Sequence, residues 1–65
     1  MTIQNNIKEL RTKKNVTQEQ LAEAVGVSRQ TIGAIEKGNY IPSLLLAINL
    51  ARFFDVSVEK IFSVK

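Results

Sequence analysis

Apolar residues recur along the chain at the spacing of a helix, and short groups of turn-forming residues separate the apolar segments. A spacing of i, i+3 and i+4 places side chains on one face of an α-helix. The pattern predicts five short amphipathic helices, over about residues 5–14, 17–25, 28–37, 44–54 and 58–62. The first has Ile7 and Leu10 on its inner face, with Ile3 as a further candidate, and Asn15 is suited to end it in a left-handed conformation.

The second and third predicted helices are separated by a short turn at Gly26. Thr17 and Gln20 have the spacing of a capping box, in which the two residues satisfy each other's free backbone amides. Gly26 can adopt the positive φ that ends a helix sharply, and Ser28 is a good N-cap for the third helix. The two helices would pack through the apolar residues Leu21, Ala22, Val25, Val27, Ile32 and Ile35.

The fourth and fifth predicted helices follow a loop that contains Pro42, with Ser43 and Ser57 as their N-caps. The inner stripe of the fourth helix is predicted to be Leu44, Ala47, Leu50, Ala51 and Phe54. Residues 2–4 and 62–65 are rich in types that favour strands, so we expect them to form a short terminal β-pair. The fold class is therefore all-α, a compact five-helix domain with this pair added.

The outward face of the third helix carries the candidate chemistry. If Ile32 and Ile35 point inward, the positions that face away from the core are Arg29, Gln30, Gly33, Ala34 and Lys37. In the major groove, arginine pairs well with guanine and glutamine with adenine, and an alanine methyl can contact thymine. Recognition helices read bases with their first turn, where Arg29 and Gln30 lie.

Gly33 has two interpretations. Glycine inside a helix costs about 1 kcal/mol relative to alanine. Either the short, packed helix tolerates this cost, or the missing side chain lets DNA approach the helix backbone closely. The sequence leaves both open.

The amino-acid composition excludes several classes of function for this chain. The chain has 65 residues, the size of one domain, and lacks both Cys and His. Disulfides are thereby excluded and only carboxylates remain as metal ligands, so we expect no metal and no cofactor. The usual nucleophiles and acid–base groups of enzymes are also missing. Nine Lys and Arg against six Asp and Glu give a net charge of +3, which suits a polyanionic partner.

No secretory signal is visible, and the longest apolar run, residues 44–48, is far too short to span a bilayer. We therefore expect a cytoplasmic protein without a membrane partner.

The segment from Gln18 to Glu36 resembles the helix-turn-helix of the lambda-repressor-like family, of the Cro/CI or XRE type. The likeness runs along almost the whole chain, through residues 6–11, 17–18, 28–32, 35–38, 42–44 and 56–57. It implies a single DNA-binding domain over residues 1–65, with the helix-turn-helix at about 17–36. It also implies binding to double-stranded operator DNA, usually as a dimer.

The resemblance implies roles for single residues as well. Arg11 and Glu36 would form a buried ion pair, and Gln18 would contact phosphate. Gly33 departs from a polar residue that is common at that position of the family. The DNA-binding set predicted from residues and resemblance together is Gln18, Ser28, Arg29, Gln30, Thr31, Gly33, Ala34, Lys37 and Asn39.

A symmetric homodimer is predicted from a surplus of apolar residues. Hydrophobic residues make up 45% of the chain, which is generous for a core of this size. An apolar surface rimmed by polar groups marks an interface. The predicted interface consists of Ile41, Leu45, Val58 and Phe62.

These observations predict a sequence-specific transcriptional regulator that binds a palindromic operator as a homodimer, and the resemblance favours a repressor. The alternative is an antitoxin or another protein-interaction module that binds DNA to regulate its own synthesis. Copurification with an acidic partner would favour that alternative. The sequence does not specify the operator or the inducing signal, nor whether Arg29 reads a base or a phosphate.

Overall fold

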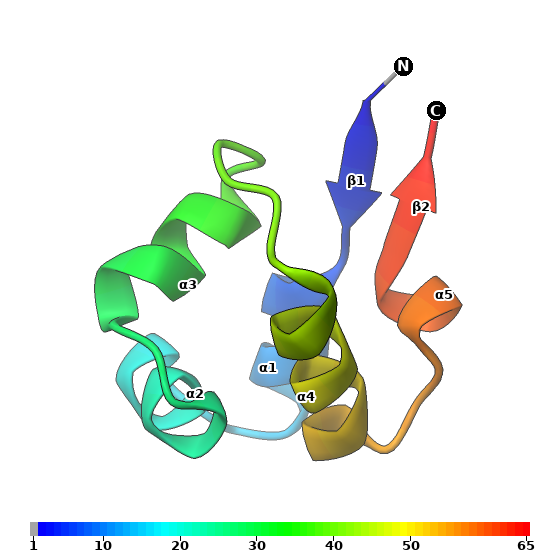
Figure 1. The fold of residues 1–65 in the computed structure, drawn as a ribbon. Helices are drawn as coiled ribbons and strands as arrows, with labels where there is room; N and C mark the ends of the chain where they lie inside the picture. The colour runs from blue at the N-terminus through cyan, green and yellow to red at the C-terminus, as the bar shows by residue number, and fades with distance from the viewer. Residues whose placement is uncertain (1) are drawn as a thin grey trace.

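Five short helices and a pair of terminal strands surround an apolar core in the computed structural model, which describes residues 2–65 (Figure 1). The helices are α1 (Ile7–Lys13), α2 (Gln18–Val25), α3 (Arg29–Glu36), α4 (Leu44–Phe54) and α5 (Val58–Ile61). The strands are β1 (Ile3–Asn5) and β2 (Phe62–Val64). The predicted five-helix fold is confirmed, and none of the helices in residues 2–65 has the length and hydrophobicity that crossing a bilayer requires.

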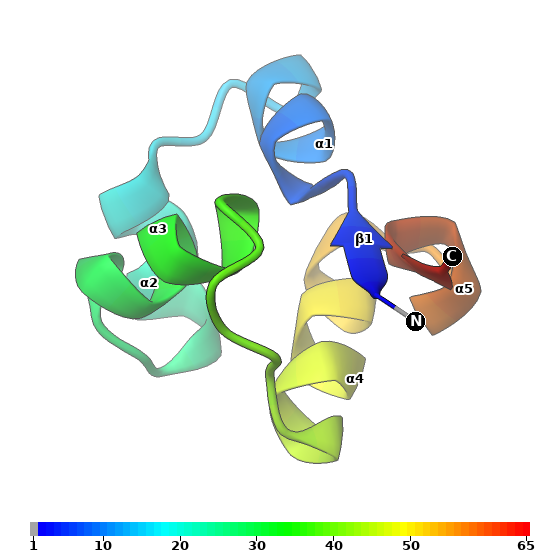
Figure 2. The same ribbon diagram turned by 90° about the horizontal axis from the view of Figure 1, so that it is seen from above.

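The two strands bring the chain ends together. They pair antiparallel, with Ile3 opposite Val64, and backbone hydrogen bonds of 2.8 Å between Thr2 and Lys65 extend the ladder. Figures 1 and 2 place this pair beside α5, on the side of the molecule away from α2 and α3. The termini therefore leave α2 and α3 uncovered.

Local sequence signals set both ends of α2 and the start of α3 as predicted, whereas Ser57 precedes α5 without a capping hydrogen bond from its side chain. The Thr17 hydroxyl accepts a hydrogen bond of 3.0 Å from the Gln20 amide, and the Gln20 side chain accepts one of 2.9 Å from the Thr17 amide. Gly26 ends α2 with a φ of 78°, and Asn15 follows α1 with a φ of 58°. The Ser28 hydroxyl caps α3 through the Thr31 amide.

The start of the chain differs from the prediction. α1 begins at Ile7 rather than near Asn5, because Asn5 belongs to β1 and its Oδ1 accepts a hydrogen bond from the Ile7 amide. Ile3 lies in β1 and is exposed, so its expected place on the inner face of the first helix is wrong. At the other end Phe62 opens β2 instead of closing the fifth helix.

α4 supplies more of the core than any other helix, but not with the predicted stripe. Leu44 is 74% exposed, because the first turn of α4 projects beyond the other helices (Figure 2). Leu46 is buried in its place, and Phe54 is half-buried against the core. The buried apolar residues are Ile7, Leu21, Ala22, Ile32, Ile35, Leu46, Ala47, Leu50, Ala51 and Ile61.

Replacing Gly26 by alanine is expected to destabilise the fold by roughly 1–2 kcal/mol, because its left-handed conformation brings a Cβ close to the following carbonyl oxygen. No neighbouring side chain contributes, since an added Cβ has nothing within 4 Å. Urea unfolding measures the effect. Gly33→Ala is the control, because Gly33 is helical and the change should raise stability by up to about 1 kcal/mol. Equal destabilisation by both changes would contradict the argument.

Candidate nucleic-acid interface

α2 and α3 pack closely, and this packing decides which side of α3 faces solvent. Ala22 is 3% exposed, small enough for α3 to cross near it, and the Val27 amide donates to the Ala22 carbonyl oxygen across the turn. Ile32 and Ile35 are fully buried. The opposite side of α3 is open at the edge of the molecule, as Figures 1 and 2 show.

The predicted DNA-binding residues lie on this open side. Arg29 and Gln30 are exposed at the start of α3, and Thr31 is half-buried with its hydroxyl 2.9 Å from that of Ser28. Gly33 and Ala34 are half-buried farther along. A hollow of about 440 Å³ brings α2 and α3 residues together, and its lining is Gln18, Arg29, Gln30, Gly33, Ala34, Lys37 and Asn39.

The charges of the site suit an anion. Arg29 and Lys37 line the hollow, and no carboxylate is among its lining residues. Lys14 is engaged elsewhere, because its Nζ lies 5.4 Å from the centroid of the Phe53 ring. Among residues 2–65 no group of three or more acidic, Cys or His side chains is placed to hold a metal.

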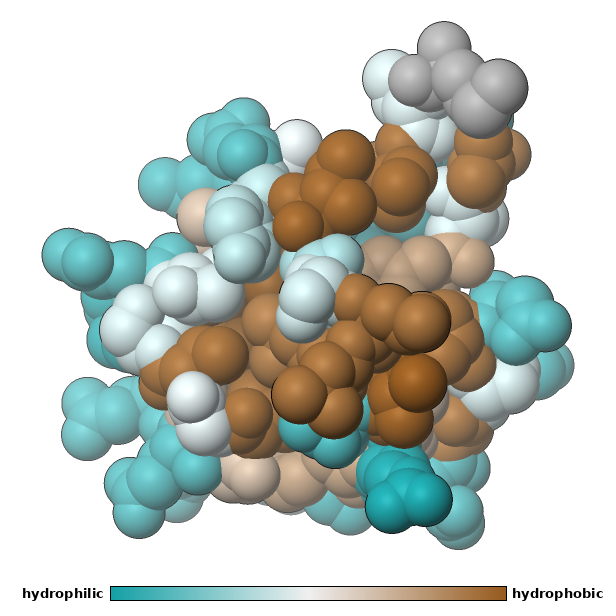
Figure 3. Space-filling view, in the orientation of Figure 1, coloured by the Kyte–Doolittle hydropathy of each residue, from teal (hydrophilic) through white to brown (hydrophobic). Residues whose placement is uncertain are grey.

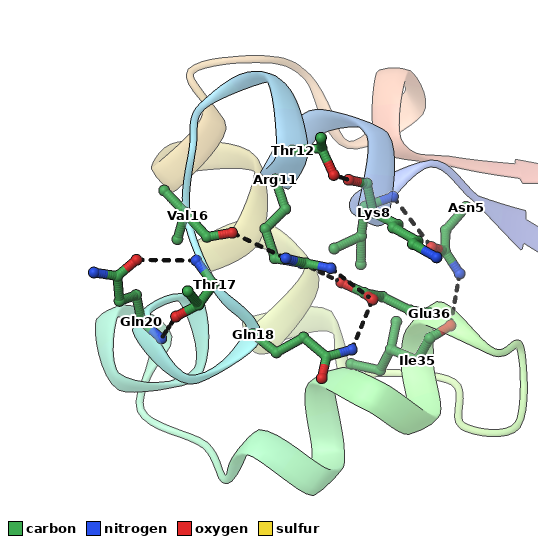
Figure 4. Close-up of polar contacts among 11 residues, drawn as sticks. Asn5, Lys8, Arg11, Thr12, Val16, Thr17, Gln18, Gln20, Ile35 and Glu36 are labelled. Carbon is green, nitrogen blue, oxygen red and sulfur yellow. Dashed lines mark hydrogen bonds and ion pairs between the residues drawn. The ribbon is translucent and has the colours of Figure 1, made fainter.

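The carboxylate of Glu36 joins three helices (Figure 4). Its Oε2 accepts a hydrogen bond of 2.8 Å from Arg11 Nε, and its Oε1 accepts one of 2.9 Å from Gln18 Nε2 and a longer one from Arg11 Nη2. Arg11 also donates from Nη1 to the Val16 carbonyl oxygen at 3.0 Å. The side chains of Arg11 and Glu36 are 15% and 5% exposed, so water contributes little to either charge.

This network constrains what Gln18 can do. One N–H of its side-chain amide is taken by Glu36, and an amide has two such donors. A phosphate contact by Gln18 would therefore use the second N–H. The same hydrogen bond holds the Gln18 side chain against the hollow beside Gly33.

Asn5 is a residue that sequence reasoning missed. Its Nδ2 donates a hydrogen bond of 2.8 Å to the Ile35 carbonyl oxygen in the last turn of α3. The same carbonyl oxygen accepts a hydrogen bond of 2.9 Å from the Gly38 amide, so Asn5 adds a second bond that ties β1 to the end of α3. No local pattern indicates it, since the two residues are thirty positions apart.

The sequence pattern of the helix-turn-helix family matches residues 7–61. The chain belongs to this family. Its type is lambda-repressor-like, or XRE, as its structural neighbours are. Among relatives, the uncharacterised HTH-type transcriptional regulators YgzD of Bacillus subtilis and MJ0272 of Methanocaldococcus jannaschii are 50% and 57% identical over 60 residues. Each alignment covers 92% of this chain and 91% of the relative.

Solved structures of helix-turn-helix proteins share the fold. The restriction-modification controller protein C.AhdI from Aeromonas hydrophila is 35% identical, with a TM-score of 0.77 over 83% of this chain and 82% of that one. The biofilm regulator SinR, solved in complex with DNA, is 31% identical, with a TM-score of 0.74 over 82% of this chain and 86% of that one.

Replacing Arg11 by methionine is expected to destabilise the protein by about 3–5 kcal/mol, because the nearly buried Glu36 carboxylate loses its charged partner. Urea unfolding measures the loss. The double variant Arg11→Met/Glu36→Leu should recover most of it, since removing both charges leaves no unpaired ion. A double variant as unstable as the single one would refute the charge argument.

Proposed function

We propose that the protein is a sequence-specific DNA-binding transcriptional regulator that inserts α3 into the major groove. The observation that carries the proposal is the exposure of Arg29 and Gln30 on the first turn of α3, beside a hollow without carboxylates. Both side chains suit base edges. The similarity to SinR, whose structure contains DNA, and to relatives named as transcriptional regulators supports the same function.

In this proposal some residues contact the DNA bases and others contact the DNA backbone. Arg29 and Gln30 read base edges, which carry the sequence information. Ser28, Thr31, Gln18, Lys37 and Asn39 hold phosphates and set the register of α3 on the duplex. Because phosphate contacts release counterions, the affinity falls as salt rises.

Arg29→Ala is expected to remove sequence preference more than it removes affinity. A duplex selected from a random DNA pool is compared with a scrambled duplex by fluorescence anisotropy at several salt concentrations. A bidentate base contact discriminates by about 1–3 kcal/mol, so the selected duplex should lose roughly 5- to 150-fold and the scrambled one much less.

Arg52→Ala is the matched control, because Arg52 is an exposed arginine on α4 outside the hollow. It should leave the preference between the two duplexes unchanged. Equal losses on both duplexes with Arg29→Ala would assign Arg29 to a phosphate. Failure to select any duplex would reject the proposed function.

We also propose that the protein acts as a symmetric homodimer. Ile41 and Leu45 of the predicted interface are 66% and 70% exposed, whereas Val58 and Phe62 are half-buried against the core. Figure 3 shows apolar side chains gathered over α4 and the segment that leads into it. We call the exposed residues there the α4 patch: Ile41, Leu44, Leu45 and Ile48.

The proposed two-fold pair forms through the α4 patch, which shares no residue with the lining of the hollow beside α3. Two recognition helices about 34 Å apart read half-sites one DNA turn apart, so the operator is a palindrome. We propose repression, which the resemblance to the lambda-repressor-like family favours.

Leu45→Glu is expected to shift the protein from dimer to monomer, because it would bury an unpaired carboxylate in the contact. Sedimentation velocity at a fixed concentration measures the shift. Ala24→Glu, which adds the same charge at an exposed position of α2, should remain dimeric. Persistence of the dimer in Leu45→Glu would place the interface elsewhere.

A further inference from the structure

α3 ends in a turn formed by Lys37, Gly38 and Asn39, which we call the α3 turn. The Asn39 amide donates to the Ala34 carbonyl oxygen and the Gly38 amide donates to that of Ile35, each at 2.9 Å. Gly38 has a φ of 80°. These features define a Schellman motif, in which backbone hydrogen bonds close the helix end without help from a side chain.

Asn5 of β1 adds a hydrogen bond that this helix end does not need. Its Nδ2 donates to the Ile35 carbonyl oxygen at 2.8 Å, and that oxygen already has the Gly38 amide as a donor. A carbonyl oxygen has two lone pairs, so it can accept both bonds. The effect of the Asn5 bond is therefore to hold β1 and the α3 turn at a fixed separation.

The Asn5 side chain is itself held at both ends of its amide. Its Oδ1 accepts a hydrogen bond of 3.2 Å from the Ile7 amide at the start of α1. β1 is paired with β2, where Asn5 lies opposite Phe62. β1 is thus anchored by elements other than α3, and the Asn5 bond extends that anchorage to the α3 turn.

The α3 turn lies between two open spaces. On its β1 side is a cleft of about 280 Å³, whose lining is Ile3, Gln4, Asn5, Glu36, Lys37 and Gly38. Lys37 and Asn39 also line the hollow that carries the candidate DNA contacts. The turn therefore has room to shift on the side of the cleft, and such a shift would move Lys37 relative to a bound duplex.

We propose that Asn5 is a positioning residue for DNA binding, which holds the α3 turn so that Lys37 contacts a backbone phosphate. This role rests on the proposed function and gives the terminal β-pair a part in it. The first turn of α3 is held separately, by the Ser28 cap. Loss of the Asn5 bond therefore weakens the phosphate contact and leaves base reading by Arg29 in place.

Asn5→Asp tests this role, because the carboxylate keeps an oxygen for the Ile7 amide but has no N–H to donate to Ile35. Affinity for a duplex selected from a random DNA pool is measured by fluorescence anisotropy at several salt concentrations. Each phosphate contact contributes about 0.9 to the magnitude of the slope of log affinity against log salt. The slope should fall by about that amount for each bound copy of the protein, while the preference over a scrambled duplex is kept.

Lys37→Ala is the reference for a lost phosphate contact. Alone it should lower the slope by the same amount, and combined with Asn5→Asp it should lower the slope no further. A purely structural role of Asn5 would reduce the free energy of unfolding and leave the slope of the folded protein unchanged. Urea unfolding of each variant gives the folded fraction in the binding assay.

Gln4 provides the matched controls, because it is the neighbouring residue of β1, is exposed and lines the same cleft. Gln4→Glu makes the same change from amide to carboxylate and should keep the slope of the unmodified protein. Asn5→Ser is a second variant, which removes the long reach without adding a charge and keeps a hydroxyl for the local bond to Ile7. It should lower the slope as Asn5→Asp does, even if the carboxylate prevents folding, and Gln4→Ser should not.

The outcomes separate the role of Asn5 from the function on which it rests. If no duplex is selected, the proposed function fails. If a duplex is selected but Lys37→Ala or Asn5→Ser leaves the slope unchanged, the role of Asn5 is overturned and the function stands. Slope losses that add in the double variant overturn it equally, because Asn5 would then act elsewhere than through Lys37.

Discussion

The nearly buried carboxylate of Glu36 is the interaction on which the arrangement of the site depends. Burying a charge is costly unless hydrogen bonds and an opposite charge compensate for the lost water. Arg11 from α1 and Gln18 from α2 supply that compensation, so one residue of α3 is tied to both preceding helices. Rotating α3 about its axis would break these bonds. The side of α3 that faces solvent is thereby fixed.

The remaining contacts of α3 also hold this helix in a fixed orientation. An isolated helix of eight residues is not stable in water, so α3 depends on its surroundings. Ser28 caps its first turn, Asn5 binds a carbonyl of its last turn, and Ile32 lies fully buried between them. A binding face held at both ends loses little conformational freedom when a ligand docks, which leaves more of the contact energy for affinity and selectivity.

The sequence predicted the features that depend on near neighbours. The capping box at Thr17, the left-handed Gly26 and the inward phase of Ile32 follow from residues within a few positions, and the structure has all three. Features that depend on distant elements of the chain were harder to predict from the sequence. Whether Leu44 is covered depends on where the other helices end, and the bond from Asn5 to α3 depends on a strand pair formed by both chain ends.

The candidate site shows the same difference between features that depend on near neighbours and features that depend on distant residues. The outward residues of α3 follow from its helical phase alone, which is why Arg29 and Gln30 could be named from the sequence. The hollow could not be predicted from the sequence, because Gln18 of α2 forms one wall of it. The position of the Gln18 side chain depends in turn on its hydrogen bond to Glu36. The ion pair itself was expected only from family resemblance, since nothing local links two residues twenty-five positions apart.

The modest charge of the chain gives the proposed dimer a physical role. A net charge of +3 and a few cationic contacts provide little affinity for a polyanion at physiological salt. Two copies on one duplex double the phosphate contacts and bring the second α3 to its half-site at high effective concentration. In the proposed dimer, weak contacts by each copy would suffice for tight binding to a palindrome, while a lone copy on unrelated DNA would dissociate readily. In that arrangement the α4 patch contributes to sequence selectivity without touching a base.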